Sequence, residues 1–258
     1  MNSMQPIGEQ LRDWRQRRRL SQLDLALDAE ISTRHLSFVE TGRAAPSRDM
    51  VLRLAAELDV PLRERNALLL AAGYAPVFAE RSLDDAGLRQ AKAAIETLLA
   101  AQDPFPALAI DRHWNLIAAN RGARALLAGI AEHLLKPPVN MLRVSLHPDG
   151  AAPRIQNLAE WRAHLLHRLR KQFEASADPK LLELIEELRG YPAPPAQPTN
   201  PGALAVPLVV RGKHGTMSFL STTMLFGAPL DVTLSELAIE IFLPADAETV
   251  ERLRRASQ

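Results

Sequence analysis

Between Ile7 and Gly73, apolar side chains recur at the three- and four-residue intervals that place them on one face of a helix. This spacing predicts five helices, over residues 7–19, 22–30, 33–41, 48–58 and 61–72. Ser21 and Ser32 stand where they can cap the second and third helices, and Asp24 can complete a capping box with Ser21. Gly42 supplies the left-handed conformation that ends the third helix.

The same spacing predicts the interior of this all-α domain. Leu23, Ala26 and Leu27 share one face of the second helix and should point inward. Leu36 should do so from the third helix. Trp14 lies on the apolar stripe of the first helix, so we expect it in the core rather than stacked on a base.

Two short capped helices joined by a tight turn predict a helix-turn-helix, whose second helix fits the major groove of DNA. Its outer face carries Thr33, Arg34, Ser37 and Phe38. Arg34 can donate two hydrogen bonds to guanine. Gln22, at the start of the preceding helix, stands where side chain and backbone N–H groups can grip phosphate. The alternative interpretation is a helical hairpin with an ordinary solvated face.

Residues 7–72 resemble the XRE family, the phage repressor and Cro type of helix-turn-helix. The matching segments are Leu11-Arg12, Leu20-Ser21-Gln22, Leu25-Ala26, Ile31-Ser32, Leu36, Val39-Glu40-Thr41-Gly42-Arg43 and Pro46-Ser47. The resemblance implies DNA contacts at the positions of Gln22, Thr33 and Arg34, and a phosphate contact at Arg43. Phe38 departs from the polar residue often found there, and it can pack on a thymine methyl or partly on the protein. The complete set expected to contact DNA is Gln22, Ser32, Thr33, Arg34, Ser37, Phe38, Arg43 and Arg18.

Arginines cluster at the end of the first predicted helix. They are Arg12, Arg15, Arg17, Arg18 and Arg19. They either suit the negative end of the helix dipole at a solubilised helix end or contact phosphate. The net charge of +1 does not distinguish between these two interpretations.

Composition restricts the class of protein. A chain of 258 residues with 47% hydrophobic residues is long enough for two domains. Without cysteine it forms no disulfide or thiolate metal site, and no signal-like start or membrane-length apolar run stands out, so we expect a cytoplasmic protein. The expected divisions are a DNA-binding domain at 1–75, a linker and connecting helix at 76–103, and a second domain at 104–258.

After Pro104 the pattern changes to a mixture of strands and helices. Strands are predicted at 106–110, 114–119, 203–211, 216–226 and 235–243. Helices are predicted at 84–101, from the cap Asn120 to about 127, and through 155–189 with a break at 177–179. Residues 190–202 are proline-rich and predict an extended loop. Hairpin turns are expected at 212–215 and 227–229, and a short charged helix or frayed end after Asp246.

Two strands, a helical block and three antiparallel strands resemble the PAS arrangement, and Asp111-Arg112-His113-Trp114-Asn115 with Asn120 resembles its opening hairpin and helix. With the repressor-like N-terminus and segments 140–143, 157–162 and 204–244, the chain resembles the MmyB-like transcription regulators. The resemblance implies a two-domain protein: a five-helix domain, then an α+β PAS-like domain with a five-stranded antiparallel sheet. It also implies a small ligand, long and apolar, such as a fatty acid.

A ligand in a PAS-like domain should lie between the sheet and its covering helices. The apolar candidates for the walls are Trp114, Trp161, Leu165, Met217, Phe219 and Met224, each of which can equally be plain core. The polar candidates for holding a carboxylate are Asn120, Arg143, His147 and Arg162.

Catalytic motifs are absent from the sequence, with no nucleophile elbow, Walker loop or metalloprotease helix, so we expect no enzyme and no cofactor. His164 and His167 lie one helical turn apart, but no carboxylate pair completes a metal site, and Arg168 with its basic neighbours is expected on the surface. The sequence therefore predicts a ligand-responsive, homodimeric transcription regulator that binds double-stranded DNA and no membrane. A protein-interaction adaptor that uses the repressor-like domain for docking is the alternative.

Overall fold

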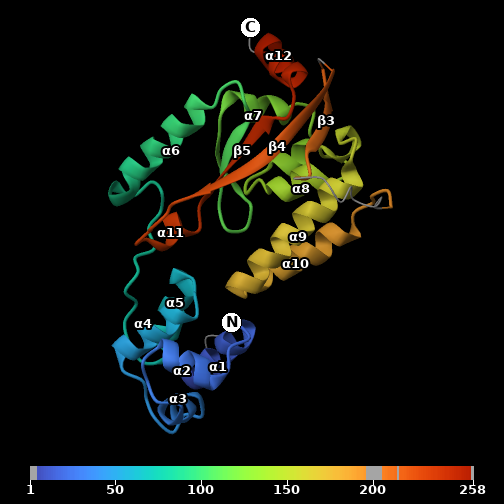
Figure 1. The fold of residues 1–258 in the computed structure, drawn as a ribbon. Helices are drawn as coiled ribbons and strands as arrows, with labels where there is room; N and C mark the ends of the chain where they lie inside the picture. The colour runs from blue at the N-terminus through green and yellow to red at the C-terminus, as the bar shows by residue number, and fades with distance from the viewer. Residues whose placement is uncertain (1–4, 196–204, 214, 257–258) are drawn as a thin grey trace. The chain divides into compact units, whose positions relative to one another are not determined.

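The computed structural model describes residues 5–195, 205–213 and 215–256 (Figure 1). The chain divides into two compact units. The first comprises the chain up to Glu80 with the segments Lys171–Pro179 and Pro229–Ser235, and the second comprises the rest. Within the described ranges, no helix has both the length and the apolar character needed to cross a membrane.

The first unit contains the five predicted helices. They are α1 (Ile7–Arg17), α2 (Gln22–Asp28), α3 (Thr33–Glu40), α4 (Arg48–Glu57) and α5 (Leu62–Ala71). The predicted capping box is confirmed, because the Ser21 side chain accepts from the N–H of Asp24 and the Asp24 carboxylate accepts from the N–H of Ser21. Ser32 caps α3, and Gly42 takes a left-handed φ of 73° after it. Trp14 is fully buried, as predicted.

The predicted inner face of α2 is wrong. Leu25 and Ala26 are buried, whereas Leu23 and Leu27 are 56% and 68% exposed. A helix of seven residues that carries three leucines and an alanine offers two overlapping apolar stripes. Packing against α3 and α4 selects the stripe with Leu25 and Ala26, which local spacing cannot distinguish from the other.

The second unit is built on a five-stranded antiparallel sheet, as predicted. Its strands are β1 (Ala107–Ile110), β2 (Leu116–Ala119), β3 (Leu208–Gly212), β4 (Gly215–Leu225) and β5 (Ala238–Pro244), in the order β2-β1-β5-β4-β3. Ala109 pairs with Ile239 at the centre, where the first and last strands meet. Residues 196–202 of the predicted proline-rich loop, 203–204 of a predicted strand and His214 of a predicted turn lie outside the described residues.

The alternation of side chains gives this sheet two different faces. On one face Ala109, Ile239 and Ile241 pack with Ile95 and Leu99 of α6 (Arg89–Ala101). The predicted connecting helix therefore covers one face of the sheet. The domain boundaries at 75 and 104 stay predictions.

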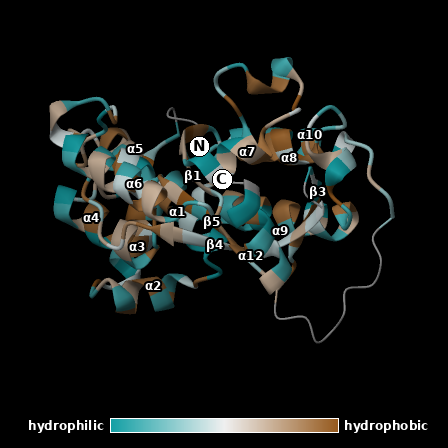
Figure 2. Ribbon diagram, turned by 90° about the horizontal axis from the view of Figure 1, so that it is seen from above, coloured by the Kyte–Doolittle hydropathy of each residue, from teal (hydrophilic) through white to brown (hydrophobic). Residues whose placement is uncertain are grey.

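The opposite face of the sheet is covered by the remaining helical block, as Figure 1 shows. Its helices are α7 (Arg121–Leu126), α8 (Met141–Leu146), α9 (Leu158–Ser176) and α10 (Pro179–Gly190), with short 3-10 turns at η2 (Glu132–Leu135) and η3 (Ala152–Arg154). The predicted break between α9 and α10 is confirmed, at Ala177 with a φ of 59°. Most helices carry both teal and brown segments in Figure 2, as amphipathic helices do.

The short elements α8, α11 (Val232–Ser235), η2 and η3 were not predicted from the sequence, and the helix predicted at 84–101 begins with the 3-10 turn η1 (Ala86–Leu88). The predicted strand at 235–243 begins later, at Ala238, because α11 includes Ser235. The charged tail forms α12 (Ala247–Ala256). These elements are only one or two turns long, too short for a periodic pattern to identify.

Candidate DNA-binding surface and ligand cavity

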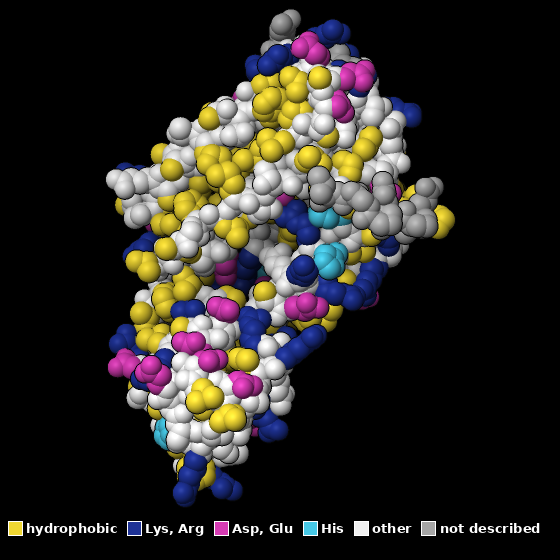
Figure 3. Space-filling model, viewed as in Figure 1, with side chains coloured by type: hydrophobic (Ala, Val, Ile, Leu, Met, Phe, Trp, Pro, Cys, Tyr) yellow, Lys and Arg dark blue, Asp and Glu magenta, His cyan; other side chains and the backbone are white. Residues whose placement is uncertain are grey.

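The third helix presents the predicted recognition residues to solvent. α3 buries Leu36 and Val39 and leaves Arg34 exposed, with Thr33, Ser37 and Phe38 partly exposed beside it. Arg43 follows the helix and is also exposed. Basic side chains project from the end of the first unit that carries α3 (Figure 3). The arrangement suits a helix whose outer face meets the edges of bases while flanking cations meet phosphate.

Phe38 contacts two of these cations. The guanidinium carbon of Arg34 lies 5.4 Å from the centre of the Phe38 ring, and that of Arg43 lies 6.0 Å from it. Both distances are in the range of a cation–π interaction. The ring therefore packs on the protein and restrains both arginines toward the outer face of α3, which favours the second of the two roles left open for it.

Three other residues of the predicted DNA-contacting set are engaged within the protein. The Ser32 hydroxyl accepts from the N–H of His35 at 3.2 Å, and the Gln22 amide donates to Glu40 at 2.8 Å. Arg18 donates to the carbonyls of Leu58 and Asp59 at 2.8 and 2.9 Å, at the end of α4. Arg18 thus closes a helix end, and the phosphate contact predicted for it would require it to leave these carbonyls.

Arg15 is a second correction to the basic cluster. Its guanidinium donates two hydrogen bonds to the Glu40 carboxylate, at 2.7 and 2.9 Å, and both side chains are buried. The hydrogen bond to Glu40 raises the pKa of Arg15 above its ordinary value. Because Glu40 also accepts from Gln22, one buried carboxylate joins α1, α2 and α3 and holds the recognition helix in place.

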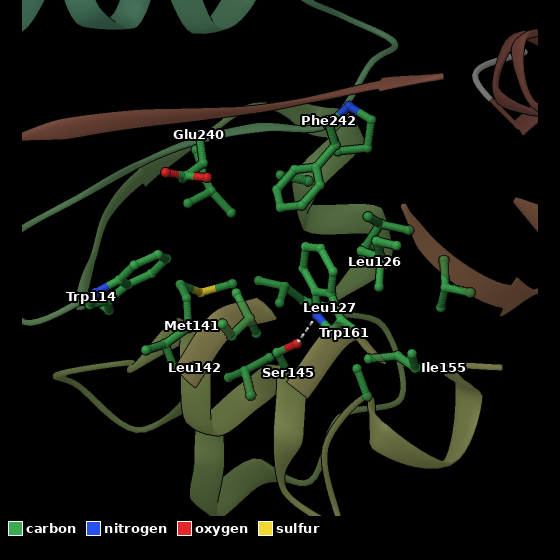
Figure 4. Close-up of a pocket in the computed structure, with 18 of the residues that line it drawn as sticks. Trp114, Leu126, Leu127, Met141, Leu142, Ser145, Ile155, Trp161, Glu240 and Phe242 are labelled. Carbon is green, nitrogen blue, oxygen red and sulfur yellow. Dashed lines mark hydrogen bonds between the residues drawn. The ribbon is translucent and has the colours of Figure 1, made fainter. Parts of the chain in front are cut away.

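The second unit contains a cavity between its sheet and its helices. The space is about 820 Å³ including its opening to solvent, and Figure 4 shows apolar side chains converging on it. Its apolar lining comprises Pro106, Leu108, Trp114, Ala123, Leu126, Leu127, Met141, Leu142, Val144, Ala151, Ile155, Trp161, Leu165, Leu208, Val210 and Phe242. The polar lining comprises Ser145, Arg154, Arg168 and Glu240. Such a composition fits a largely apolar ligand with few polar groups.

The predicted wall residues separate into two groups. Trp114, Trp161 and Leu165 line the cavity, and the indole N–H of Trp161 donates to the Ser145 hydroxyl at 3.0 Å. Met217, Phe219 and Met224 on β4 do not line it. Phe219 is fully buried in contact with Phe242, Met217 is half-buried, and Met224 is 42% exposed.

The polar anchors predicted from the sequence lie elsewhere. Asn120 caps α7 and donates to the carbonyls of Leu99 and Phe105, so its amide is fully used inside the fold. Arg162 donates to the carbonyl of Arg189. Neither residue lines the cavity.

Arg143 and His147 belong to a separate network. Arg143 donates to Glu187 at 2.7 and 2.8 Å, and the hydroxyl of Tyr191 donates to the same carboxylate. Burial and that hydrogen bond raise the pKa of Tyr191 to about 12. The His147 ring packs edge-on against Tyr191, with 5.0 Å between ring centres.

One end of the cavity carries a partly buried ion pair that was not predicted from the sequence. Arg168 donates to Glu240 at 2.6 and 3.1 Å, and Glu240 also accepts from the Thr223 hydroxyl at 2.7 Å. The Arg168 guanidinium lies 4.8 Å from the centre of the Trp114 ring. The sequence predicts Arg168 on the surface, whereas in the structure it lines the cavity. The sequence feature that points to this pair is Glu240, which shares a strand face with Phe242. A carboxylate that is buried on that face needs a cation.

The other end carries a cation of a different kind. Arg154 donates to the carbonyls of Leu126 and Ala128, at 2.8 and 3.0 Å. Within the described ranges no carboxylate pairs with it, and burial lowers its pKa below the ordinary value. In Figure 4, Leu126 and Ile155 mark this end, opposite Trp114 and Glu240. Arg168 is therefore neutralised within the protein, whereas the charge of Arg154 is not.

Comparisons with known proteins match two stretches of the chain, one around the helix-turn-helix and one that includes the cavity. Residues 11–65 match the model of a helix-turn-helix family, and residues 91–256 match that of the MmyB-like transcription regulator ligand binding domain. A curated relative is the "Uncharacterized HTH-type transcriptional regulator RghRB" of Bacillus subtilis (strain 168), 38% identical over 78 residues. That match covers 30% of this chain and 54% of the relative, so the chain spans about half the relative's length. The chain therefore belongs to the family of MmyB-like transcription regulators, whose ligand binding domain matches more than half of it, and it carries a helix-turn-helix segment ahead of that domain.

Proposed function

We propose that this regulator binds an amphipathic anion of the fatty-acid class in the cavity of its second unit, and that occupancy modulates its binding to DNA. The observation that carries the proposal is the apolar cavity with an unneutralised arginine, Arg154, at one end. An apolar chain gains free energy by leaving water for such walls. A carboxylate beside Arg154 gains a charge-assisted hydrogen bond.

The two ends of the cavity support one orientation of the ligand. At the Trp114 end, Arg168 is already paired with Glu240, and a carboxylate there would meet the negative charge of Glu240. At the Leu126 end, the partners of Arg154 among the residues that the structure describes are backbone carbonyls. We therefore place the head group at Arg154 and the end of the chain toward Trp114.

The test compares dodecanoic acid with dodecanol, which has a matched chain and no charge. Trp114 and Trp161 line the cavity, so binding to the full-length protein is followed by tryptophan fluorescence. We expect the acid to bind about 10- to 100-fold more tightly than the alcohol, as for a hydrogen bond between charged groups. Arg154→Met should abolish that preference, and Arg162→Met, outside the cavity, should retain it.

Two outcomes would count against different parts of this proposal. If neither probe binds the wild-type protein, the cavity does not take an aliphatic ligand. If both bind equally and Arg154→Met changes nothing, the cavity takes apolar ligands without the anchor at Arg154.

We further propose that Thr33, Arg34, Ser37 and Arg43 make the DNA contacts, with Phe38 packed beneath the two arginines and Gln22 and Ser32 assisting at helix N-termini. We also propose that the protein acts as a homodimer. One short recognition helix reads few base pairs, and two half-sites one helical turn apart multiply specificity. A ligand that binds one dimer geometry better than another would shift the population between them. Selection of bound sequences from a random duplex pool, at about 150 mM salt, should recover an inverted repeat. Recovery of a single half-site would contradict the dimer.

A further inference from the structure

A group of metal-ligand side chains lies outside both sites described above. His133 belongs to η2, His147 directly follows α8, and Asp149 lies in the next turn. The Nε2 atom of His133 lies 3.8 Å from an Asp149 carboxylate oxygen, and the Nδ1 atom of His147 lies 3.9 Å from the same oxygen. One potential ligand atom from each residue lies within 4.8 Å of the other two.

Backbone and ring contacts hold these three residues near one another. The N–H of Ala131, close to His133, donates to the carbonyl of Asp149 at 3.2 Å. The two imidazole rings meet edge-on with centres 5.5 Å apart, and the far side of His147 packs on Tyr191. Two separate segments are thus joined where their ligand atoms converge.

We propose that His133, His147 and Asp149 form a binding site for a divalent transition metal such as Zn²⁺. Two imidazole nitrogens and one carboxylate oxygen suit Zn²⁺ and its neighbours, whereas Mg²⁺ and Ca²⁺ require oxygen ligands. Three protein ligands leave the fourth tetrahedral position to water or an external ligand. The metal would be held on the surface, next to the turn that follows a helix of the cavity wall.

The geometry requires a small rearrangement. In a tetrahedral site with bonds of about 2.0–2.1 Å, ligand atoms lie about 3.4 Å apart. The two nitrogen–oxygen distances of 3.8 and 3.9 Å must therefore shorten by about 0.5 Å, and the distance between the two nitrogens, which is at most 4.8 Å, by up to about 1.4 Å. The side chains of His133 and Asp149 are 54% and 62% exposed, which leaves them room to move. His147 Nδ1 accepts a hydrogen bond from the N–H of Asp149 at 3.0 Å, and a metal at that nitrogen replaces this bond.

Titration of the full-length, chelator-treated protein with ZnCl₂, followed by calorimetry, tests the proposal. We expect one equivalent of Zn²⁺ to bind, and His133→Ala, His147→Ala or Asp149→Asn to weaken binding by roughly 10- to 100-fold or more. His167→Ala is the matched control, because His167 is exposed on α9, one turn from His164, and should leave binding unchanged. Circular dichroism checks that each variant keeps its fold.

The proposal is overturned if the wild-type protein takes up no Zn²⁺, or if the three cluster variants bind it as well as the wild type. Loss of binding in His167→Ala alone would assign the metal to α9 instead. Should His147→Ala fail to fold because it loses packing on Tyr191, the exposed positions 133 and 149 decide the question by themselves.

Discussion

The two units of this protein differ in how their interiors are packed. The helical unit buries Leu11, Trp14 and Leu36 fully, and its candidate functional side chains lie on the outer face of α3. The α+β unit leaves a cavity open between sheet and helices, and its candidate functional side chains face inward. A surface that must match DNA needs a rigid support, whereas a ligand site needs unfilled space inside a formed fold.

Each unit contains an arginine–glutamate ion pair, and the two pairs differ in their exposure and their surroundings. Arg15 and Glu40 keep 10% and 1% of their side chains exposed, and they join three helices. Arg168 and Glu240 keep 24% and 4% exposed, and they border the cavity. The first pair is expected to serve stability of the recognition helix. The second closes one end of a site, where solvent or a ligand can reach the arginine.

The largest expected effect comes from breaking the pair in the closed core. Glu40→Ala leaves Arg15 buried without its carboxylate, so the free energy of unfolding of the helical unit should fall by about 3–5 kcal/mol. Urea unfolding monitored by circular dichroism measures it. The double variant Arg15→Met/Glu40→Leu should recover most of the loss, because no charge is left unpaired. A loss below about 1 kcal/mol in Glu40→Ala would mean that water reaches Arg15.

Breaking the pair beside the cavity should cost less. Glu240→Ala is expected to lower the free energy of unfolding of the α+β unit by about 2–3 kcal/mol, since Arg168 can turn toward solvent while Thr223 loses its acceptor. The same urea experiment measures it. Glu240→Gln, which retains an acceptor for Thr223, is the matched control and should cost less. If Glu240→Ala lowered the free energy of unfolding as much as Glu40→Ala, the two ion pairs would not differ in how strongly they stabilise their units.

The outward-facing surface should tolerate substitution without loss of stability. Arg34→Ala should cost about 1–3 kcal/mol of specific DNA binding and relax the choice of base at one position. Competition binding against random duplex measures this, and Arg89→Ala, an exposed arginine on α6, should bind as the wild type does. Equal weakening on specific and random DNA would make Arg34 a phosphate contact instead.

The smallest effect concerns an ion pair at the surface of the α+β unit. Hydrogen bonds from Arg143 hold the pKa of Glu187 below its ordinary value of 4.5. The folded state therefore favours the carboxylate, so its contribution is present at neutral pH and is lost as the pH falls below 4.5 through the folded value. The pair is partly exposed, so salt should weaken it.

Unfolding of the wild type and Arg143→Met, compared at neutral pH and at about pH 3, isolates this contribution. The difference between the two proteins should be largest at neutral pH and shrink in acid. A difference independent of pH would show that Arg143 stabilises the fold by packing alone.

Much of the fold can be predicted from patterns of residues that are close together in the sequence. Ser21 with Asp24, Ser32, Gly42 and Asn120 act on backbone groups within a few residues, so helix ends were predictable from sequence. Strand alternation in 238–244 likewise predicted a sheet with two faces. These features need no knowledge of what lies opposite them. The sequence by itself therefore determined the fold class and the outer face of α3.

The identity of the buried polar groups was decided by the tertiary structure. Arg15 meets a carboxylate 25 positions away, and Arg168 one that is 72 positions away. No local pattern distinguishes these arginines from their exposed neighbours. The same limit explains why the sequence predicts anchors at Asn120, Arg143, His147 and Arg162 and does not single out Arg154, which lines the cavity. A side chain's charge is known from sequence, but whether it is neutralised depends on distant residues that only the folded chain brings within hydrogen-bonding distance.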